Sequence, residues 1–368
     1  MPLPATIEIL FALFAFIFGA TVGSFLNVCI HRLPRDLSVN RPKRSFCPAC
    51  EKQIAWFHNL PLVSWLILRG RCHYCGAHIA FRYFLVELLT ALLFLAIWLF
   101  YPFWIAPAFW VFVALLIVAT FIDFEWFIIP DSITYGSVVA GLLLSMALPQ
   151  LHGETVWWRG GLGALIGAAA GYFGLWAVVE IGKLAFGKKK IAFDQPTPFH
   201  FERSDEEPWV LVSEEDRLAW SEIIARRTDV LTIHCKILNI DGPKQKNVTL
   251  LAGEEGIRVG DRNLKPQEVG KIKGTMTSMI IPREAMGFGD VKFLAGIGAF
   301  LGWQGVLFTV FSSSVIGAVI GILLILLRRE EWGTKLPYGP YLSLGALIWL
   351  FGGHALWSWY ILSLQQPL

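Results

Sequence analysis

Long apolar runs, separated by polar stretches, dominate this 368-residue chain. A helix needs about 20 predominantly apolar residues to cross the hydrocarbon core of a bilayer. Runs near this length lie at residues 5–30, 80–101, 104–124, 132–149, 159–185, 290–303, 304–327 and 339–362. The pattern predicts an all-α polytopic membrane protein with about eight transmembrane helices. The run at 290–303 is too short to span comfortably, so we expect a half-helix or part of a broken helix there.

Two polar stretches are long enough to fold outside the bilayer. The predicted order is a first transmembrane helix at 1–30, a cytosolic loop at 31–80, transmembrane helices 2–5 at 81–186, a cytosolic insert at 187–286 and transmembrane helices 6–8 at 287–368. Alternating residues predict strands at 231–237 and 248–251, and the pattern at 214–227 predicts a short helix. The insert is therefore expected to be a small α+β unit. The glycine-rich stretch 160–174 predicts close helix packing.

Basic residues follow the first, fifth and seventh apolar runs, and the positive-inside rule places those ends in the cytoplasm. They include His31, Arg32, Arg35, Arg41, Lys43, Arg44, Lys183, Lys188, Lys189, Lys190, Arg328 and Arg329. The opposite loops hold almost no basic residues, so we expect the N-terminus outside the cytoplasm. The composition fits a membrane protein, with 55% hydrophobic residues and a mean hydropathy of +0.56. A net charge of +3 gives no case for nucleic-acid binding.

Two aspartates stand at the expected cytoplasmic ends of apolar runs. Asp123 closes the run 104–124, and Asp290 heads the run 290–303. An ionisable group at membrane depth is a functional-site candidate by default. Two carboxyls that share one proton can activate water, so the pair predicts an intramembrane aspartyl protease. Helix capping is the alternative for Asp290, and ion or proton binding by a scaffold or transporter is the alternative for the pair.

Glu125 and Asp131 compete with Asp123 for the first catalytic place. Pro130 should end the preceding helix, because its ring clashes with the carbonyl four residues back. Asp131 then stands where the N-cap of the next helix belongs. Asp123 lies on the helix itself, with no local capping task. We therefore assign Asp123 and Asp290 as a dyad, one protonated and one ionised, with a water between them.

Four cysteines form two CxxC pairs within the 31–80 loop. They are Cys47 with Cys50 and Cys72 with Cys75. Four thiolates suit tetrahedral zinc and leave no open position for a catalytic water, so the sequence predicts a structural zinc site. A reducing cytosol disfavours two structural disulfides. Thioredoxin-like redox chemistry is the poorer alternative, and His73 or His78 could replace a cysteine as ligand.

Several motifs, in this order along the chain, resemble those of the prepilin peptidases, or type IV leader peptidases. They are Gly23-Ser24-Phe25-Leu26-Asn27-Val28, His31-Arg32-Leu33-Pro34, the doubled CxxC, Asp123 followed by Ile129-Pro130-Asp131, and Gly287-Phe288-Gly289-Asp290-Val291-Lys292. The resemblance implies an inner-membrane aspartyl protease that cleaves the basic leader of type IV prepilins or type II secretion pseudopilins at the cytoplasmic face. It also implies methylation of the new N-terminus with S-adenosylmethionine, using the 31–80 loop.

The resemblance marks further residues. Gly287 and Gly289 accompany Asp290. Lys292 and Glu125 could tune the charge of the dyad or hold substrate, although a lysine there is otherwise a snorkelling anchor. Asn27 and Arg32 are candidates for positioning the substrate or the loop; their simpler roles are a helix-end hydrogen bond and a positive-inside anchor.

The chain departs from the family at two points. The link before the Gly-x-Gly-Asp motif is usually much shorter than the 187–286 insert. No glycine fingerprint of the dinucleotide kind supports methyl transfer, so a peptidase without methylation is the alternative.

Overall fold

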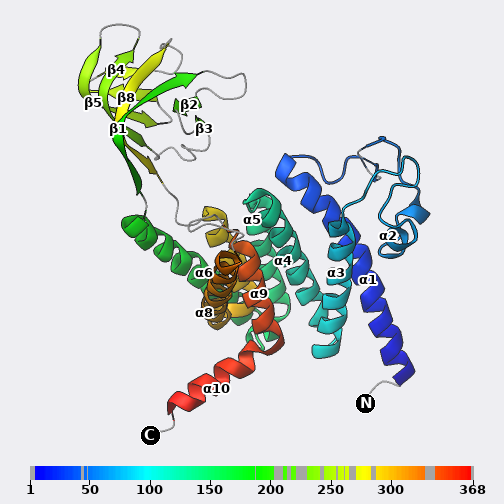
Figure 1. The fold of residues 1–368 in the computed structure, drawn as a ribbon. Coiled ribbons are helices and arrows are strands. Elements are labelled where there is room, and N and C mark those ends of the chain that lie inside the picture. Colours follow the sequence, from blue (N-terminus) through cyan, green and yellow to red (C-terminus); the bar gives the residue numbers. More distant parts are fainter. Residues whose placement is uncertain are drawn as a thin grey trace. The chain divides into compact units, whose positions relative to one another are not determined.

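A computed structural model describes residues 5–42, 45–47, 49–186, 188–202, 210–213, 217–220, 230–240, 244–253, 256–260, 262–264, 271–282, 287–327 and 336–365. The chain divides into two compact units (Figure 1). The first comprises Met1–Ala177 and Met286–Leu368, and the second comprises Val178–Ala285. Of the basic residues that predict the orientation, Lys43, Arg44, Arg328 and Arg329 lie outside the described residues.

Five helices of the described chain are long and apolar enough to cross a membrane. They are α1 (Ala5–Arg32), α3 (Phe81–Phe100), α4 (Ala106–Trp126), α6 (Trp157–Phe186) and α8 (Phe288–Leu326). Each covers a predicted apolar run. Helix α5 (Asp131–Ala147) covers another but is shorter. Large apolar side chains such as Leu10, Phe173 and Phe311 lie exposed on these helices, as expected of residues that face lipid.

The runs at 290–303 and 304–327 join into the single helix α8 in place of two separate spans. Its backbone breaks at Gly302, where φ is 73° and ψ is 176°. The expectation of a broken helix is therefore confirmed, because a left-handed φ interrupts the helical hydrogen bonds and is tolerated by glycine. The last predicted run is also interrupted: α9 (Gly339–Ile348) continues through a π-helical turn (Trp349–Gly353) into α10 (His354–Gln365).

Helix packing brings distant parts of the sequence together. Helix α1 lies along α3, and α8 contacts both α5 and α9 (Figure 1). The predicted close packing of the glycine-rich stretch is confirmed at Gly167, where a β-carbon would lie 2.0 Å from the carbonyl oxygen of Gly298. The backbones of α6 and α8 therefore touch directly, as small residues allow in membrane helices. The rings of Phe112 in α4 and Phe300 in α8 pack against each other at a tilt.

In the described part of the loop between α1 and α3, the regular elements are short. They are two 3-10 helices, Leu33–Arg35 and Trp56–His58, and helix α2 (Val63–Ile67). Two isolated antiparallel bridges, Phe46 with Gln53 and Arg71 with His78, each enclose one CxxC pair. Each pair thus sits in its own tight turn.

The described residues of the second unit form an eight-stranded antiparallel sheet, in the order β3-β2-β1-β8-β4-β5-β6-β7. The strands are β1 (Lys188–Glu202), β2 (Val210–Ser213), β3 (Arg217–Ala219), β4 (Leu231–Ile240), β5 (Gln245–Gly253), β6 (Gly256–Val259), β7 (Arg262–Leu264) and β8 (Ile272–Pro282). Buried Phe199, Ile233, Leu250 and Met276 belong to its core. The strands predicted at 231–237 and 248–251 are confirmed within β4 and β5.

The helix predicted at 214–227 is wrong at Arg217–Ala219, which form strand β3. Leu218 pairs with the buried Leu211 of β2, so cross-strand pairing overrides the local helical pattern. Residues 214–216 and 221–227 of the predicted helix lie outside the described residues.

Candidate functional site

Asp123 lies in the last turn of α4, where its side chain is buried. The backbone N–H of Gly339, in the first turn of α9, donates a hydrogen bond of 2.9 Å to Asp123 Oδ2. The first N–H groups of a helix have no partner within that helix. Helix α9 therefore directs a free donor at this carboxyl and fixes its orientation.

Asp290 lies in the first turn of α8 and is 7% exposed. Within the described chain its Oδ1 is buried without a hydrogen-bond partner. A buried carboxyl oxygen without a partner is costly and calls for an explanation. Asp123 lies near enough for its charge to act on the Asp290 carboxyl. One helix end and one helix start thus bring these acids, far apart in sequence, into one region.

Ile129 lies close to the segments that carry both acids. A β-carbon at Gly339 would lie 3.1 Å from Ile129 Cδ1 and 2.8 Å from Asp123 Oδ2. A β-carbon at Gly289 would lie 3.4 Å from Ile129 Cβ. At Gly287 the nearest atom would be Asp290 Oδ2, at 3.5 Å. The segments that carry the acids therefore meet around the chain that links α4 to α5, and glycine keeps the approach open.

Two ion pairs border this region. Arg82, in the first turn of α3, pairs with Glu125 of α4. Lys292 Nζ lies 2.6 Å from Asp131 Oδ1 and joins the starts of α8 and α5. Asp131 is the first residue of α5 and makes no side-chain cap, so the predicted N-cap role is wrong. Its carboxylate serves instead as the partner of Lys292.

The four cysteines of the loop form one cluster. The sulfur atoms of Cys47, Cys50, Cys72 and Cys75 all lie within 4.8 Å of one another. Cys47 Sγ and Cys75 Sγ are 3.8 Å apart, far beyond a disulfide bond. Zinc with Zn–S distances of about 2.3 Å places tetrahedral sulfurs about 3.8 Å apart. The cluster fits a metal ion, and among the described residues its ligand set contains neither His73 nor His78.

The two turns of the cluster share one backbone design. Glu51 and Gly76, each directly after the second cysteine of its pair, have left-handed φ values of 56° and 71°. Their N–H groups donate to the carbonyls of Cys47 and Cys72 at 2.8 and 2.9 Å. These hydrogen bonds close each turn and hold both sulfurs of the pair on the same side of it.

Ionisation of the thiols is uneven. The N–H groups of Cys75 and Tyr74 hydrogen-bond to the Cys72 sulfur and lower the pKa of that thiol to about 7. The N–H of Ala77 acts in the same direction on Cys75, but desolvation and hydrogen bonds with the other three thiols outweigh it and raise the pKa of Cys75 to about 11. Four neighbouring thiolates repel one another, which disfavours ionisation of all four. A bound cation offsets this repulsion and favours the thiolate form.

Asn27 and Arg32 both attach α1 to its surroundings. Asn27 Nδ2 donates to the carbonyl of Tyr83 in α3 at 3.0 Å. The Arg32 guanidinium donates to the carbonyls of Ser38, Val39 and Pro42 at 2.9 to 3.2 Å. Arg32 therefore fastens the start of the loop onto the end of α1, which is more specific than a general positive-inside anchor.

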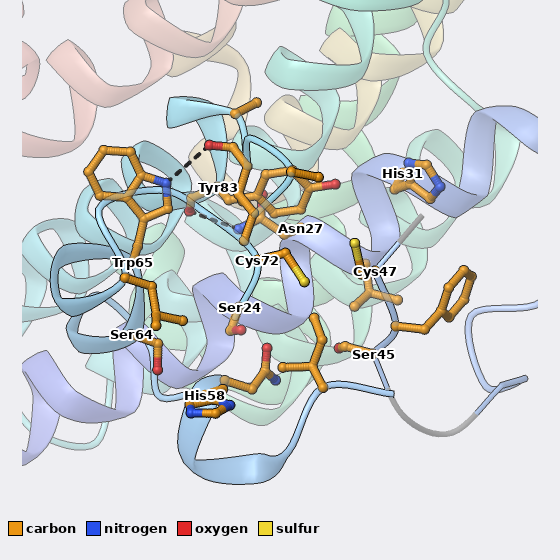
Figure 2. Close-up of a pocket in the computed structure, with 18 of the residues that line it drawn as sticks. Ser24, Asn27, His31, Ser45, Cys47, His58, Ser64, Trp65, Cys72 and Tyr83 are labelled. Carbon is orange, nitrogen blue, oxygen red and sulfur yellow. Dashed lines mark hydrogen bonds between the residues drawn. The ribbon is translucent and has the colours of Figure 1, made fainter. Parts of the chain in front are cut away.

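A cavity of about 630 Å³ lies beside the cysteine cluster, between α1, the loop and the start of α3 (Figure 2). Asn27, His58, Trp65, Tyr83 and Glu87 are among the residues that line it. Neither Asp123 nor Asp290 is among its lining residues, so the cavity is distinct from the aspartate region.

Two protein-family models match this chain, one over the part with the cysteine loop and the other over the part with the two aspartates. A model described as the bacterial peptidase A24 N-terminal domain matches residues 17–101, and one described as the type IV leader peptidase family matches residues 110–193 and 269–322. A protein of Aeromonas hydrophila called "Prepilin leader peptidase/N-methyltransferase" is 31% identical over 94% of this chain and 92% of its own length. Proteins with the same name are 42% identical over 51% of the chain and 54% of their own length in Myxococcus xanthus, and 27% over 95% and 93% in Pseudomonas aeruginosa. No solved structure matches the chain.

Proposed function

Because this chain belongs to the type IV leader peptidase family, we propose that it removes the basic leader of prepilins or pseudopilins with Asp123 and Asp290 and then methylates the new N-terminus. The observation that carries the proteolytic part is the pair of buried, neighbouring carboxyls at helix ends, one of them oriented by a backbone donor. Paired aspartates of this kind are suited to peptide hydrolysis.

The hydrogen bonds favour different roles for the two acids. The Gly339 N–H stabilises a negative charge on Asp123. Asp290 Oδ1, which is buried without a donor, is the natural place for the shared proton. Asp123 takes a proton from water as the water oxygen attacks the scissile carbonyl, and Asp290 gives its proton to the carbonyl oxygen. On collapse the C–N bond breaks as Asp123 gives its proton to the leaving amine nitrogen, and one hydroxyl of the tetrahedral intermediate returns a proton to Asp290, so both carboxyls regain their starting state.

Zinc is the metal that best suits the four clustered thiols, and we propose a structural role for it. All four ligands come from the protein, so no position is left for a reacting water. S-adenosylmethionine would supply an electrophilic methyl group, and the loop at 31–80 is the proposed methylation region.

The rest of the proposed domain division consists of the membrane helices at 1–30, 81–186 and 287–368 and the insert at 187–286.

The proposed setting is the inner membrane, with about eight spans, the N-terminus outside the cytoplasm and lipid around the helices. Three further spans would come from the short α5, from a division of α8 at its break at Gly302, and from the α9–α10 segment. Gly287 and Gly289 would keep the approach to Asp290 open, and Lys292 would hold the starts of α5 and α8 together.

Separate sites predict separable activities. Asp123→Asn protein is expected to methylate a pre-cleaved pilin peptide at close to the wild-type rate, because the cavity beside the loop does not include Asp123. The measurement uses labelled S-adenosylmethionine and the purified full-length protein. Loss of methylation in a folded Asp123→Asn protein, with wild type active on the same peptide, would show that the two reactions share a site.

Gly339→Ala is expected to slow leader cleavage by a factor on the order of 10 to 100, because the added methyl would lie 2.8 Å from Asp123 Oδ2 and displace that carboxyl. The loss should fall on kcat, with KM nearly unchanged, since Gly339 acts through Asp123. Gly136→Ala is the matched control, because its added methyl meets no atom within 4 Å. Equal losses in the two variants would contradict the positioning role of Gly339.

A further inference from the structure

Six large apolar side chains lie exposed on the second half of the loop between α1 and α3. We call them the loop patch; they are Trp56, Phe57, Leu60, Val63, Leu66 and Ile67. Their exposed fractions run from 43% at Leu60 to 77% at Trp56. The sequence around them is uncharged, because residues 53–68 contain no Asp, Glu, Lys or Arg. An exposed apolar patch of this kind marks a surface for another protein or for a membrane.

The position of Leu62 places the loop patch beside the membrane part of α3. The Leu62 N–H donates to Glu87 Oε2 at 2.7 Å. Glu87 follows Phe81, the first residue of α3, at a distance of about 9 Å along the helix axis. The whole of α3 is about 30 Å long, which is the thickness of the hydrocarbon core. Because α3 is just long enough to cross that core, the residues beside Glu87 lie at the border of the bilayer.

Trp65 fixes helix α2 against the start of α3 (Figure 1). The centroid of its ring lies 5.6 Å from that of Phe81 and 5.1 Å from that of Phe84. Its Nε1 donates to the Ile79 carbonyl at 3.3 Å. The three loop-patch residues of α2 stay exposed. Trp65 therefore faces α3, and the loop patch is left for a partner outside the described chain.

The surroundings of the loop patch favour lipid as that partner. Phe81 and Leu85, in the first two turns of α3, are 54% and 39% exposed, as expected of side chains that face lipid. Exposed basic residues outnumber acidic ones at the borders of the uncharged stretch, with Lys52, Arg69 and Arg71 against Glu51. Long basic side chains beside an apolar surface carry their charge to the lipid headgroups.

The backbone of this segment is hydrogen-bonded within the protein. The Leu60 N–H donates to Ser64 Oγ at 2.9 Å, and the Ser64 N–H donates to the Leu60 carbonyl at 3.0 Å. Together with the bond from Leu62 to Glu87, these contacts satisfy polar groups that water would otherwise satisfy. Irregular backbone beside lipid requires such partners.

The first half of the loop lies at a different level. A β-carbon at Gly23 would lie 2.7 Å from Glu87 Cα, so Gly23 and Glu87 are level with each other. Arg32 lies about 13 Å farther along α1 than Gly23. The Arg32 guanidinium donates to backbone carbonyls within residues 38–42. These residues therefore lie about 13 Å beyond the level of Leu62, on the aqueous side.

We propose that the loop patch inserts into the membrane interface, with its side chains among the first carbons of the acyl chains and its basic borders at the lipid phosphates. Interfacial elements bury their apolar faces by about 5 to 10 Å, which matches the depth of Leu62. The inference rests on α1 and α3 as membrane helices and not on the proposed reactions. The His58 and His73 rings lie 4.1 Å apart, so insertion also fixes the height of the second cysteine turn.

The test uses wild-type full-length protein in liposomes of phosphatidylcholine and phosphatidylglycerol. A small share of the lipid carries a photoactivatable diazirine at the first acyl carbons, and mass spectrometry locates the label after irradiation. We expect label on residues 53–69 as well as on Phe81 and Leu85, and only background label on residues 38–42. An unlabelled loop patch in protein whose Phe81 and Leu85 carry label would overturn the proposal, because the patch would then face water or another protein.

A double variant tests the two most exposed side chains. Trp56→Ser with Ile67→Ser is expected to lower the label on residues 53–69 by about threefold or more, because less apolar area then favours insertion. Leu37→Ser is the matched control, since it removes a side chain that is 51% exposed from the first half of the loop. The control should keep the wild-type label. An equal fall in both proteins would overturn the role of Trp56 and Ile67.

Discussion

Asp123→Asn and Asp290→Asn proteins are each expected to lose leader cleavage by a factor on the order of 10³ or more, because each removes one side of the acid–base exchange on water. The substitution keeps the shape of the side chain and removes its ability to carry the shared proton or the negative charge. In Asp123→Asn the oxygen can still accept from the Gly339 N–H, so the fold should survive. The measurement is the rate of leader removal from a purified prepilin by protein in detergent or liposomes.

Asp131→Asn provides the control for both aspartate variants. It makes the same change of charge eight positions after Asp123, at a side chain that is 65% exposed and paired with Lys292. Because the Asp131 side chain is mostly exposed, its ion pair with Lys292 contributes only about 0 to 1 kcal/mol, so cleavage should stay close to that of wild type. Substantial cleavage by either Asp123→Asn or Asp290→Asn would refute the dyad.

The second large effect is expected on the cysteine cluster. Replacing Cys47 and Cys50 with serine should reduce metal content from about one zinc per chain to nearly none, because two of four ligands are lost. The turns around the cluster should then unfold locally, since structural zinc contributes directly to folding. Cys47 and Cys72 line the cavity beside the cluster, so the wall of that cavity should be disturbed as well. Proteolysis should fall only as a consequence of the disturbed loop.

Metal analysis of the purified chain and its variants checks this result. Cys235→Ser is the control, because Cys235 is a buried thiol of strand β4 outside the cluster. A wild-type protein that is free of metal and fully active would contradict a required zinc site.

The local pattern of apolar and polar residues was sufficient to predict much of the fold. Apolar runs predict the positions of α1, α3, α4, α5 and α6 closely, because a membrane helix is specified by length and hydropathy within one segment. Alternation likewise locates β4 and β5. The short strand β3 was mistaken for a helix because its conformation depends on pairing with β2, which no single segment encodes.

The candidate site divides in the same way. The doubled CxxC pattern brings four sulfurs together, as its spacing predicts. The contact of Gly339 with Asp123 joins positions 216 residues apart and could not be read from either segment alone. A weak signal existed, since Gly339 and Pro340 open an apolar run and the first N–H groups of a helix need outside partners. The pairing of Arg82 with Glu125 left no such signal.

Strands β1 and β8 begin and end the sheet unit side by side, with Lys188 paired to Pro282. Neighbouring strands lie about 4.8 Å apart, so the chain enters and leaves this unit at nearly the same point. A short linker could bridge that gap at small entropic cost. The match to the family model pauses between residues 193 and 269, inside this unit. The sheet unit could therefore be inserted or deleted as one segment during evolution. Such a change would leave the sequence of the membrane helices on either side intact.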